Sequence, residues 1–162
     1  MIKILFICHG NICRSPMAEF VMKDLARRAE ISDQLYIASA ATSTEEIWNG
    51  MGNPVYPPAK AKLGEHGIDC EGKRAVQLTR PDYGKYDYLI GMDSTNIRNM
   101  LRMLGGDPEG KVYKLLSFAG SDRDIADPWY TGDFDATYAD VTEGCTGLLN
   151  MLLDMTALGE VR

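Results

Sequence analysis

The residues best suited to chemistry form one short segment near the N-terminus, which reads Cys8-His9-Gly10-Asn11-Ile12-Cys13-Arg14-Ser15-Pro16. Cys8 offers a nucleophilic sulfur, and Arg14 offers a planar guanidinium that can bind two oxygens of a phosphate at once. Between them the backbone can curl so that its N–H groups point inward and bind an anion. We expect Gly10 and Asn11 to supply the positive φ angles that such a loop needs. The segment therefore predicts a phosphate-binding loop, supported by His9, Gly10, Asn11, Ile12, Cys13 and Ser15.

The same segment predicts a reactive thiol at Cys8. A helix N-terminus and a neighbouring cation lower the pKa of a thiol from its usual value of about 8.5. Ser15 is close enough in sequence to hydrogen-bond the sulfur, and no acidic residue precedes Glu19 to oppose anion binding. A buried cysteine beside a surface arginine is the alternative interpretation. Composition predicts only about 0.01 chance occurrences of this Cys–Arg–Ser spacing, so we favour the functional interpretation.

A second candidate group lies in the acidic C-terminal part, where Asp127 is followed by Pro128, Trp129 and Tyr130. A carboxylic acid on a loop can protonate the departing oxygen of a phosphate ester. Trp129 and Tyr130 are expected to form flat apolar walls for an aryl group. A turn with core aromatic residues is the alternative. Crowding among acidic neighbours is expected to raise some carboxyl pKa values and keep Asp127 protonated; these neighbours are Asp122, Asp124, Asp133 and Asp135.

These groups need a scaffold, and the chain predicts alternating strands and helices. Apolar runs predict four strands, at 2–8, 34–40, 87–92 and 111–116. Helices are predicted from a Ser15 cap to about residue 29 and at 59–66, 94–104 and 134–155, with a loop at 42–58.

This pattern predicts an α/β fold in a single domain, residues 1–162. The domain has a four-stranded parallel sheet with helices on both faces, and the phosphate loop joins its first strand to its first helix. Ligands bind beyond the carboxyl ends of such strands. We therefore expect the site where three predicted strands end, at Cys8, Ser39 and Asp93.

Composition narrows the class of protein further. The 162 residues carry a net charge of −6, which argues against nucleic acid as a partner. No apolar run approaches the roughly 20 residues of a membrane-spanning helix, and no secretory signal opens the sequence, so we expect a cytoplasmic protein without membrane insertion. The four cysteines and two histidines show no metal-binding spacing, and we expect no metal.

The residues together resemble the low-molecular-weight protein tyrosine phosphatase family. That family carries a Cys-x5-Arg-Ser loop near its N-terminus and an Asp-Pro-aromatic-aromatic loop near its C-terminus, which correspond here to residues 8–15 and 127–130. Intermediate landmarks match at residues 39–42, 66–68 and 92–93. The resemblance thus extends over nearly the whole chain.

The resemblance implies a phosphatase that hydrolyses phosphotyrosine and small aryl phosphates without a cofactor. It implies that Cys8 attacks phosphorus, that Arg14 and the loop amides hold the phosphate, and that Asp127 acts first as an acid and then as a base. The implied partner is a phosphotyrosine-containing protein, in a bacterium a tyrosine kinase. We expect a monomer or a weak dimer.

The resemblance also implies supporting roles within the loop. Asn11 and Ser39 match positions that brace it through hydrogen bonds with Ser15. Cys13 matches a second loop cysteine, which can form a disulfide with an oxidised Cys8 and protect it from further oxidation.

Three departures from the family pattern affect these implications. Lys73 stands where relatives carry a bracing histidine, so the support of the loop differs here. Trp129 replaces a common tyrosine. The loop after Ser43 is extended and contains Trp48, which we expect to form a substrate wall particular to this chain.

Three alternatives stay open. A thiol arsenate reductase would need a further cysteine pair, which Cys70 lacks. Protein-arginine phosphatases resemble this family but carry threonine where Ile12 stands. A phospho-ligand binding module or redox sensor would not need the proton donor Asp127.

Overall fold

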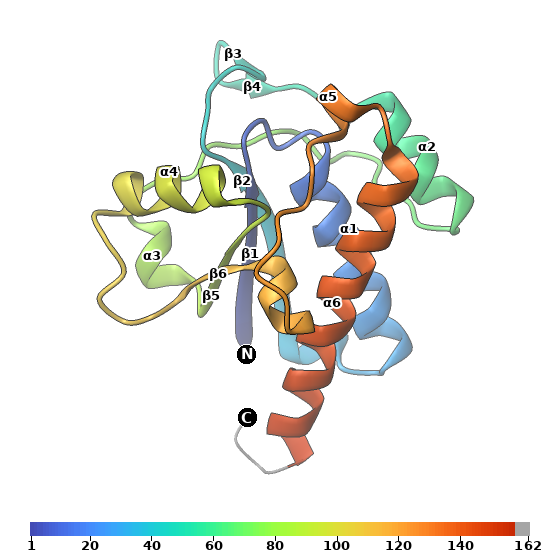
Figure 1. Ribbon diagram of the computed structural model, residues 1–162, viewed down its shortest axis with the longest axis vertical. Helices are drawn as coiled ribbons and strands as arrows, with labels where there is room; N and C mark the ends of the chain where they lie inside the picture. The colour runs from blue at the N-terminus through green and yellow to red at the C-terminus, as the bar shows by residue number, and fades with distance from the viewer. Residues whose placement is uncertain (158–162) are drawn as a thin grey trace.

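Four parallel strands form the centre of the chain in the computed structural model, which describes residues 1–157 (Figure 1). The strands are β1 (Ile2–Cys8), β2 (Leu35–Ala41), β5 (Tyr88–Gly91) and β6 (Val112–Lys114). Their order is β2-β1-β5-β6, and each neighbouring pair is parallel. The predicted α/β fold is confirmed. Residues 158–162 of the predicted domain lie outside the described residues.

Both faces of β1 are buried, which explains its nearly continuous apolar sequence. Ile4 and Phe6 belong to the core on one face, whereas Leu5 and Ile7 belong to the core on the other. This alternation follows because successive side chains of a strand point to opposite faces of the sheet.

Helices cover both faces of the sheet, as predicted. Figure 1 shows α1 (Arg14–Arg28) and α6 (Phe134–Ala157) over one face. The other face carries α3 (Asp82–Lys85) and α4 (Ser94–Leu104) (Figure 1). The helix α2 (Pro57–Glu65) contacts both α1 and α6. No helix within residues 1–157 is long and apolar enough to cross a membrane.

The strand order creates a binding position at the carboxyl edge of the sheet. From β1 the chain first builds β2 on one side and later β5 on the other side. Ligands bind where the order of an open parallel sheet reverses in this way. Cys8 ends β1, and Asp93 follows β5, so both lie at this position.

The two helices next to this position begin in different ways. The N-cap of α4 is Asp93, whose side chain accepts from the backbone N–H of Asn96 at 2.7 Å in a capping box. The helix α1 has Cys13 as N-cap and no side-chain cap. The predicted Ser15 cap is therefore wrong, because Ser15 lies inside α1 and its hydroxyl contacts Cys8 instead.

Residues 42–58 were predicted as a loop, but they contain a hairpin that was not predicted. Its strands are β3 (Ile47–Trp48) and β4 (Met51–Gly52), which pair antiparallel. Asn49 and Gly50 join them with φ angles of 51° and 75°. Two positive φ angles are typical of the tight turn whose twist matches that of the strands.

Other boundaries also shift. The predicted strand at 111–116 ends at Lys114, because the chain turns there into the 3-10 helix η2 (Leu115–Ala119). Predicted helix 59–66 begins earlier, at Pro57, because proline fits the first helical turn. Short helices η1 (Ser32–Gln34) and α5 (Pro128–Thr131) were not predicted.

Candidate active site

Cys8 lies buried at the end of β1, where the loop to α1 begins. Its sulfur is 3.0 Å from the Ser15 hydroxyl oxygen, and the backbone N–H of Ser15 donates to it at 3.4 Å. Ser15 belongs to the first turn of α1, so the positive end of the helix dipole faces the sulfur. The predicted contact between Ser15 and Cys8 is confirmed.

Asn11 fixes the direction of the hydrogen bond between Ser15 and Cys8. Its side-chain nitrogen donates to the Ser15 hydroxyl oxygen at 2.8 Å, and its side-chain oxygen accepts from the backbone N–H of Val76 at 3.0 Å. Since the Ser15 oxygen already accepts from Asn11, its own proton can be donated to the sulfur. A donated O–H stabilises a thiolate more than a thiol.

The loop takes its turn at Asn11, which has a φ angle of 58°. The expected positive φ at Gly10 is wrong, since Gly10 is not among the described residues that have one. Gly10 matters instead for space. A Cβ atom there would lie 3.2 Å from Cγ of Glu46, so the small residue allows Glu46 to approach the loop.

The Arg14 guanidinium is buried and faces three oxygens. Its Nη1 donates to Asp93 Oδ2 at 2.6 Å and to the Ile125 carbonyl at 2.8 Å, and its Nη2 donates to Asp127 Oδ2 at 3.5 Å. Burial opposes its charge, but the Cys8 sulfur and the carboxylates outweigh burial and raise the pKa of Arg14. Arg14 is therefore a fixed cation beside the sulfur.

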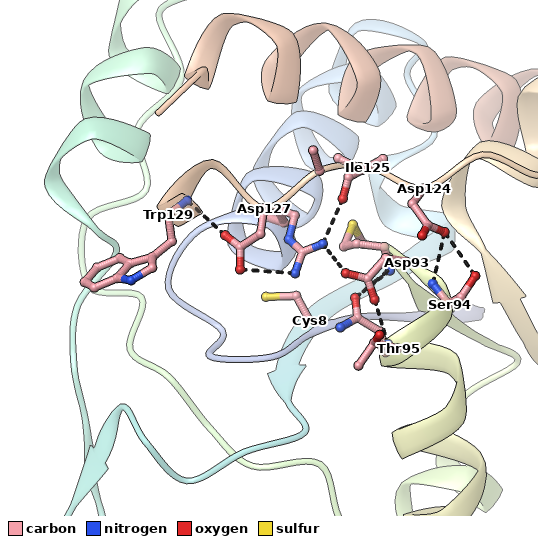
Figure 2. Close-up of polar contacts among 12 residues, drawn as sticks. Cys8, Asp93, Ser94, Thr95, Asp124, Ile125, Asp127 and Trp129 are labelled. Atoms are coloured by element: carbon pink, nitrogen blue, oxygen red, sulfur yellow. Dashed lines mark hydrogen bonds and ion pairs between the residues drawn. The ribbon is translucent and has the colours of Figure 1, made fainter. Parts of the chain in front are cut away.

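Asp127 is the N-cap of α5, and its Oδ1 accepts from the Trp129 backbone N–H at 3.0 Å. Figure 2 shows the carboxyl group of Asp127 on the side of Cys8, whereas the Trp129 ring extends in the opposite direction. About a quarter of the side chain is exposed (26%), so it can exchange protons with water. A carboxyl group held in this position can donate a proton to a group that leaves a bound phosphate.

Two of the acidic residues around Asp127 form ion pairs with lysine. Asp124 accepts from the Ser94 backbone N–H at 3.0 Å and forms an ion pair with Lys114 at 2.8 Å (Figure 2 shows the Ser94 contact). The Lys114 hydrogen bond is the main cause that lowers the pKa of Asp124. The expectation that crowding raises carboxyl pKa values is therefore wrong for Asp124. Asp135 is likewise paired, with Lys62.

A cavity of about 130 Å³ opens over the loop. Trp129 and Tyr130 line it, and the Trp129 ring packs against Tyr56 with centroids 5.0 Å apart. Trp48 does not line the cavity but stands 79% exposed on the β3–β4 hairpin. The residues that line the cavity are Cys8, His9, Gly10, Ile12, Cys13, Arg14, Glu45, Glu46, Asp127, Trp129 and Tyr130.

Ser39 supports the site through a different contact from the one expected. Its hydroxyl donates to Oε1 of buried Glu19 at 2.6 Å, so the implied hydrogen bond with Ser15 is replaced. Lys73 donates to the Ser39 carbonyl at 3.0 Å and lies 3.7 Å from Glu19. Burial lowers the pKa of Lys73, and Glu19 opposes that shift. Lys73 thus ties its segment, which also holds Asn11, to β2 and α1.

The three other cysteines, Cys13, Cys70 and Cys145, are buried thiols. Cys13 is buried, and burial together with Cys8 and Asp127 raises its pKa, which holds it as a thiol. All four cysteines are free. Within the described residues, no group of three or more His, Cys, Asp or Glu side chains could hold a metal ion.

Three residues at the site had no predicted role there. Asp93 was expected near the site only as a strand end, because its contact with Arg14 spans 79 positions and leaves no local pattern. Glu45 and Glu46 follow β2 and line the cavity over the loop, so acidic groups adjoin the predicted phosphate site although none precedes Glu19 in the sequence. A signal for that return, the Asn49-Gly50 turn just beyond them, was present in the sequence.

A doubly wound α/β domain in which β1 leads through a loop into the N-terminus of a helix, with a cysteine at the start of the loop and an arginine at its end, is typical of proteins that bind phosphate groups. The family described as low molecular weight phosphotyrosine protein phosphatase matches residues 3–158. The chain belongs to this family, and the resemblance inferred from its motifs is confirmed.

Solved relatives share the fold. The low molecular weight protein-tyrosine-phosphatase YfkJ of Bacillus subtilis is 36% identical over 92% of this chain and 94% of its own length, and its crystal structure has a TM-score of 0.89. The phosphatase SP-PTP from Streptococcus pyogenes is 39% identical, with full coverage of both chains and a TM-score of 0.84. A Drosophila arginine phosphatase is 28% identical over 93% of this chain and 98% of that one, with a TM-score of 0.81.

Proposed function

We propose that the chain hydrolyses phosphotyrosine through a cysteinyl-phosphate intermediate. The observation that carries this proposal is the convergence of Cys8, Arg14 and Asp127 on one cavity, although 113 positions separate Arg14 from Asp127. Membership of the phosphotyrosine phosphatase family supports it. Each of the three side chains supplies one requirement of phosphoryl transfer: a nucleophile, a cation and a proton donor.

In the first step the loop binds the phosphate group of the substrate. The loop from His9 to Ser15 joins β1 to α1, so its N–H groups and the helix N-terminus can face the phosphate oxygens. Arg14, oriented by Asp93, binds two of these oxygens. The phosphorus atom then lies above the Cys8 sulfur.

In the second step the Cys8 thiolate attacks phosphorus and forms an S–P bond. The bond from phosphorus to the phenolic oxygen breaks as Asp127 donates its proton to that oxygen, and the tyrosine leaves neutral. The Ser15 hydroxyl stabilises the thiolate before attack, because Asn11 directs its proton to the sulfur.

In the third step water releases the phosphate. The Asp127 carboxylate takes a proton from a water molecule, whose oxygen attacks phosphorus while the S–P bond breaks. The thiolate leaves with the help of the Ser15 hydroxyl, and inorganic phosphate departs. Besides water, the three steps use side chains and backbone N–H groups of this protein.

The walls of the cavity suit an aryl phosphate. Trp129 and Tyr130 lie beside Asp127 and offer flat apolar surface to the phenol ring. Trp48 is exposed on the β3–β4 hairpin and would contact substrate residues outside the ring. The substrate would be a phosphotyrosine-containing protein, in a bacterium a tyrosine kinase. A Drosophila arginine phosphatase shares this fold. Ile12 lines the cavity, and the family resemblance implies threonine at this position in arginine phosphatases, so the bulkier apolar side chain favours phosphotyrosine here.

One panel of substrates tests the proposal. Peptides of identical sequence that carry phosphotyrosine, phosphoserine or phosphoarginine are compared by phosphate release, and arsenate reduction is measured with a thiol reductant. We expect phosphotyrosine to exceed phosphoserine by about 10- to 100-fold, the worth of burying one aromatic ring. Faster release from phosphoarginine, or arsenate reduction without phosphatase activity, would contradict the proposal.

A further inference from the structure

Two carboxylates flank the entrance to an anion-binding cavity, which is an unusual place for negative charge. Glu45 and Glu46 belong to the segment between β2 and β3, and both line the cavity. Glu46 packs its stem against Gly10 and accepts from the side-chain nitrogen of Asn53 at 3.0 Å. Glu45 lies 2.9 Å from Nε2 of His9. Both carboxylates are therefore held at the mouth rather than free to swing away.

The negative charge at the mouth is at most partly neutralised, since Glu45 faces His9, which carries a positive charge only when it is protonated. Asn53 is neutral, so its hydrogen bond leaves the charge of Glu46 in place. Among the described residues, Arg14 is the one guanidinium that lines the cavity, and it already faces the carboxylates of Asp93 and Asp127. A doubly negative phosphate must therefore pass Glu45 and Glu46, which repel it at short range. A substrate that brings its own positive charge would turn this repulsion into attraction.

Exposed apolar side chains stand next to the two carboxylates. Trp48 and Met51 lie opposite each other across the β3–β4 hairpin and are 79% and 64% exposed. Trp48 follows Glu46 by two positions. An aromatic face beside a carboxylate suits the long apolar stem and cationic end of lysine or arginine.

We propose that the preferred substrate carries lysine or arginine within two residues of its phosphotyrosine, and that Glu45 and Glu46 recognise this basic side chain. This inference rests on the proposed function, since the phosphotyrosine must first occupy the cavity. The phosphate binds the loop while the basic side chain reaches back to the mouth, with its stem along Trp48. Acidic residues in the same positions meet the same carboxylates and are rejected.

The test uses three phosphotyrosine peptides that differ only in the residues on either side of the phosphotyrosine, which are lysine, serine or glutamate. The rate constant kcat/KM of each peptide is divided by that of a small aryl phosphate, which lacks flanking residues. At low ionic strength we expect the lysine peptide to exceed the glutamate peptide by about tenfold. Because exposed charges are screened over about 10 Å at 0.1 M salt, the ratio should fall in 0.5 M NaCl.

A double variant assigns the preference to the two carboxylates. In Glu45→Gln/Glu46→Gln, the ratio of lysine to glutamate peptide should fall to about twofold or less, since each exposed pair is worth a few-fold. The control is Glu30→Gln/Glu109→Gln, which changes net charge equally. Both control positions lie in connections that lead to the amino ends of strands, on the opposite side of the sheet, so its ratio should stay tenfold.

A wild-type ratio near one, or a ratio that persists in the Glu45→Gln/Glu46→Gln protein, would overturn the inference while leaving the phosphatase function in place. Failure to hydrolyse the aryl phosphate and every peptide would instead overturn the proposed function. Release of phosphate from a phosphoarginine peptide in preference to all three peptides would overturn both, because the positive charge would then belong to the phosphorylated residue itself.

Discussion

The Cys8 sulfur receives two hydrogen bonds from one residue, the backbone N–H and the hydroxyl of Ser15. Asn11 imposes the direction of the second bond, and Val76 holds Asn11 in place. Both bonds strengthen as negative charge builds on sulfur. They therefore stabilise the thiolate twice in the proposed cycle, before it attacks phosphorus and when it leaves.

Replacing Asp127 with alanine should separate its chemical role from its role as a helix cap. We expect the rate with phenyl phosphate to fall by about 10²- to 10⁴-fold, because the phenolate then departs without a proton. A nitrophenyl phosphate, whose phenolate departs more readily, should lose much less. Asp122→Ala, in the same acidic stretch but outside the cavity lining, is the control and should keep both rates. Equal losses on the two substrates would remove Asp127 from its proposed role.

Asp93→Asn tests whether Asp93 positions Arg14. Asparagine is as good an N-cap as aspartate, so the cap of α4 should be kept. The charge that faces Arg14 is lost, and the guanidinium is less well oriented. We expect kcat/KM for an aryl phosphate to fall by about 10- to 100-fold, as for a displaced binding group. The equilibrium affinity for inorganic phosphate should fall as well; unchanged affinity and rate would show that Asp93 only caps the helix.

At the residue scale, local patterns predicted what lies close in sequence. The spacing from Cys8 to Ser15 indicated the contact between them, which the structure confirms. Contacts between residues distant in sequence were not predicted, because no local sequence pattern indicates them. Ser39 binds Glu19 rather than Ser15, since Glu19 lies one turn further along α1 and is buried against β2.

At the scale of elements, strongly patterned segments were predicted well. The buried strand β1 and the helix α4 lie where they were predicted, at 2–8 and 94–104. Short elements were predicted less well. The β3–β4 hairpin was predicted as loop because each strand has two residues, too few for an alternating pattern, although the Asn49-Gly50 turn could have indicated it.

Close packing between α6 and η2 gives a stability test at this scale. A Cβ atom on Gly147 would overlap the carbonyl oxygen of Phe118, whereas one on Gly64 in α2 would meet open space. We expect Gly147→Ala to lower the free energy of unfolding by about 1–3 kcal/mol through overpacking. Gly64→Ala, the matched control, should raise it by about 0.5–1 kcal/mol, since alanine favours helix. Urea denaturation measures both, and a Gly147→Ala protein as stable as wild type would contradict the packing.

At the scale of the whole molecule, the parallel sheet gathers distant segments at one edge. The loop after β1, the carboxylates after β2, Asp93 after β5 and the loop before α6 all meet there. Acidic side chains of the C-terminal part pair with lysine and arginine, as in Asp124 with Lys114 and Asp140 with Arg123. The alternation of elements predicted the sheet, but not which acids would be paired.

Phosphate binding should stabilise the whole fold, because the loop links β1 to α1. At a concentration of inorganic phosphate 100 times its Kd, linkage contributes about 2.7 kcal/mol, which corresponds to a rise in Tm of roughly 5–10 °C for a chain of this size. Cys8→Ser should retain this rise, and Arg14→Lys, which loses the planar fork, should lose most of it. Chloride at equal ionic strength is the control. An equal rise for Arg14→Lys would place the phosphate elsewhere.

Cys8 is the proposed nucleophile, on which the phosphatase function depends. The most direct measurement is hydrolysis of a simple aryl phosphate by wild type and by Cys8→Ser, with a chelator and a reductant present. We predict turnover by wild type and none by Cys8→Ser, while Cys8→Ser still binds inorganic phosphate because the loop and Arg14 persist. Turnover by Cys8→Ser at the wild-type rate, or none by folded wild type, would contradict the account.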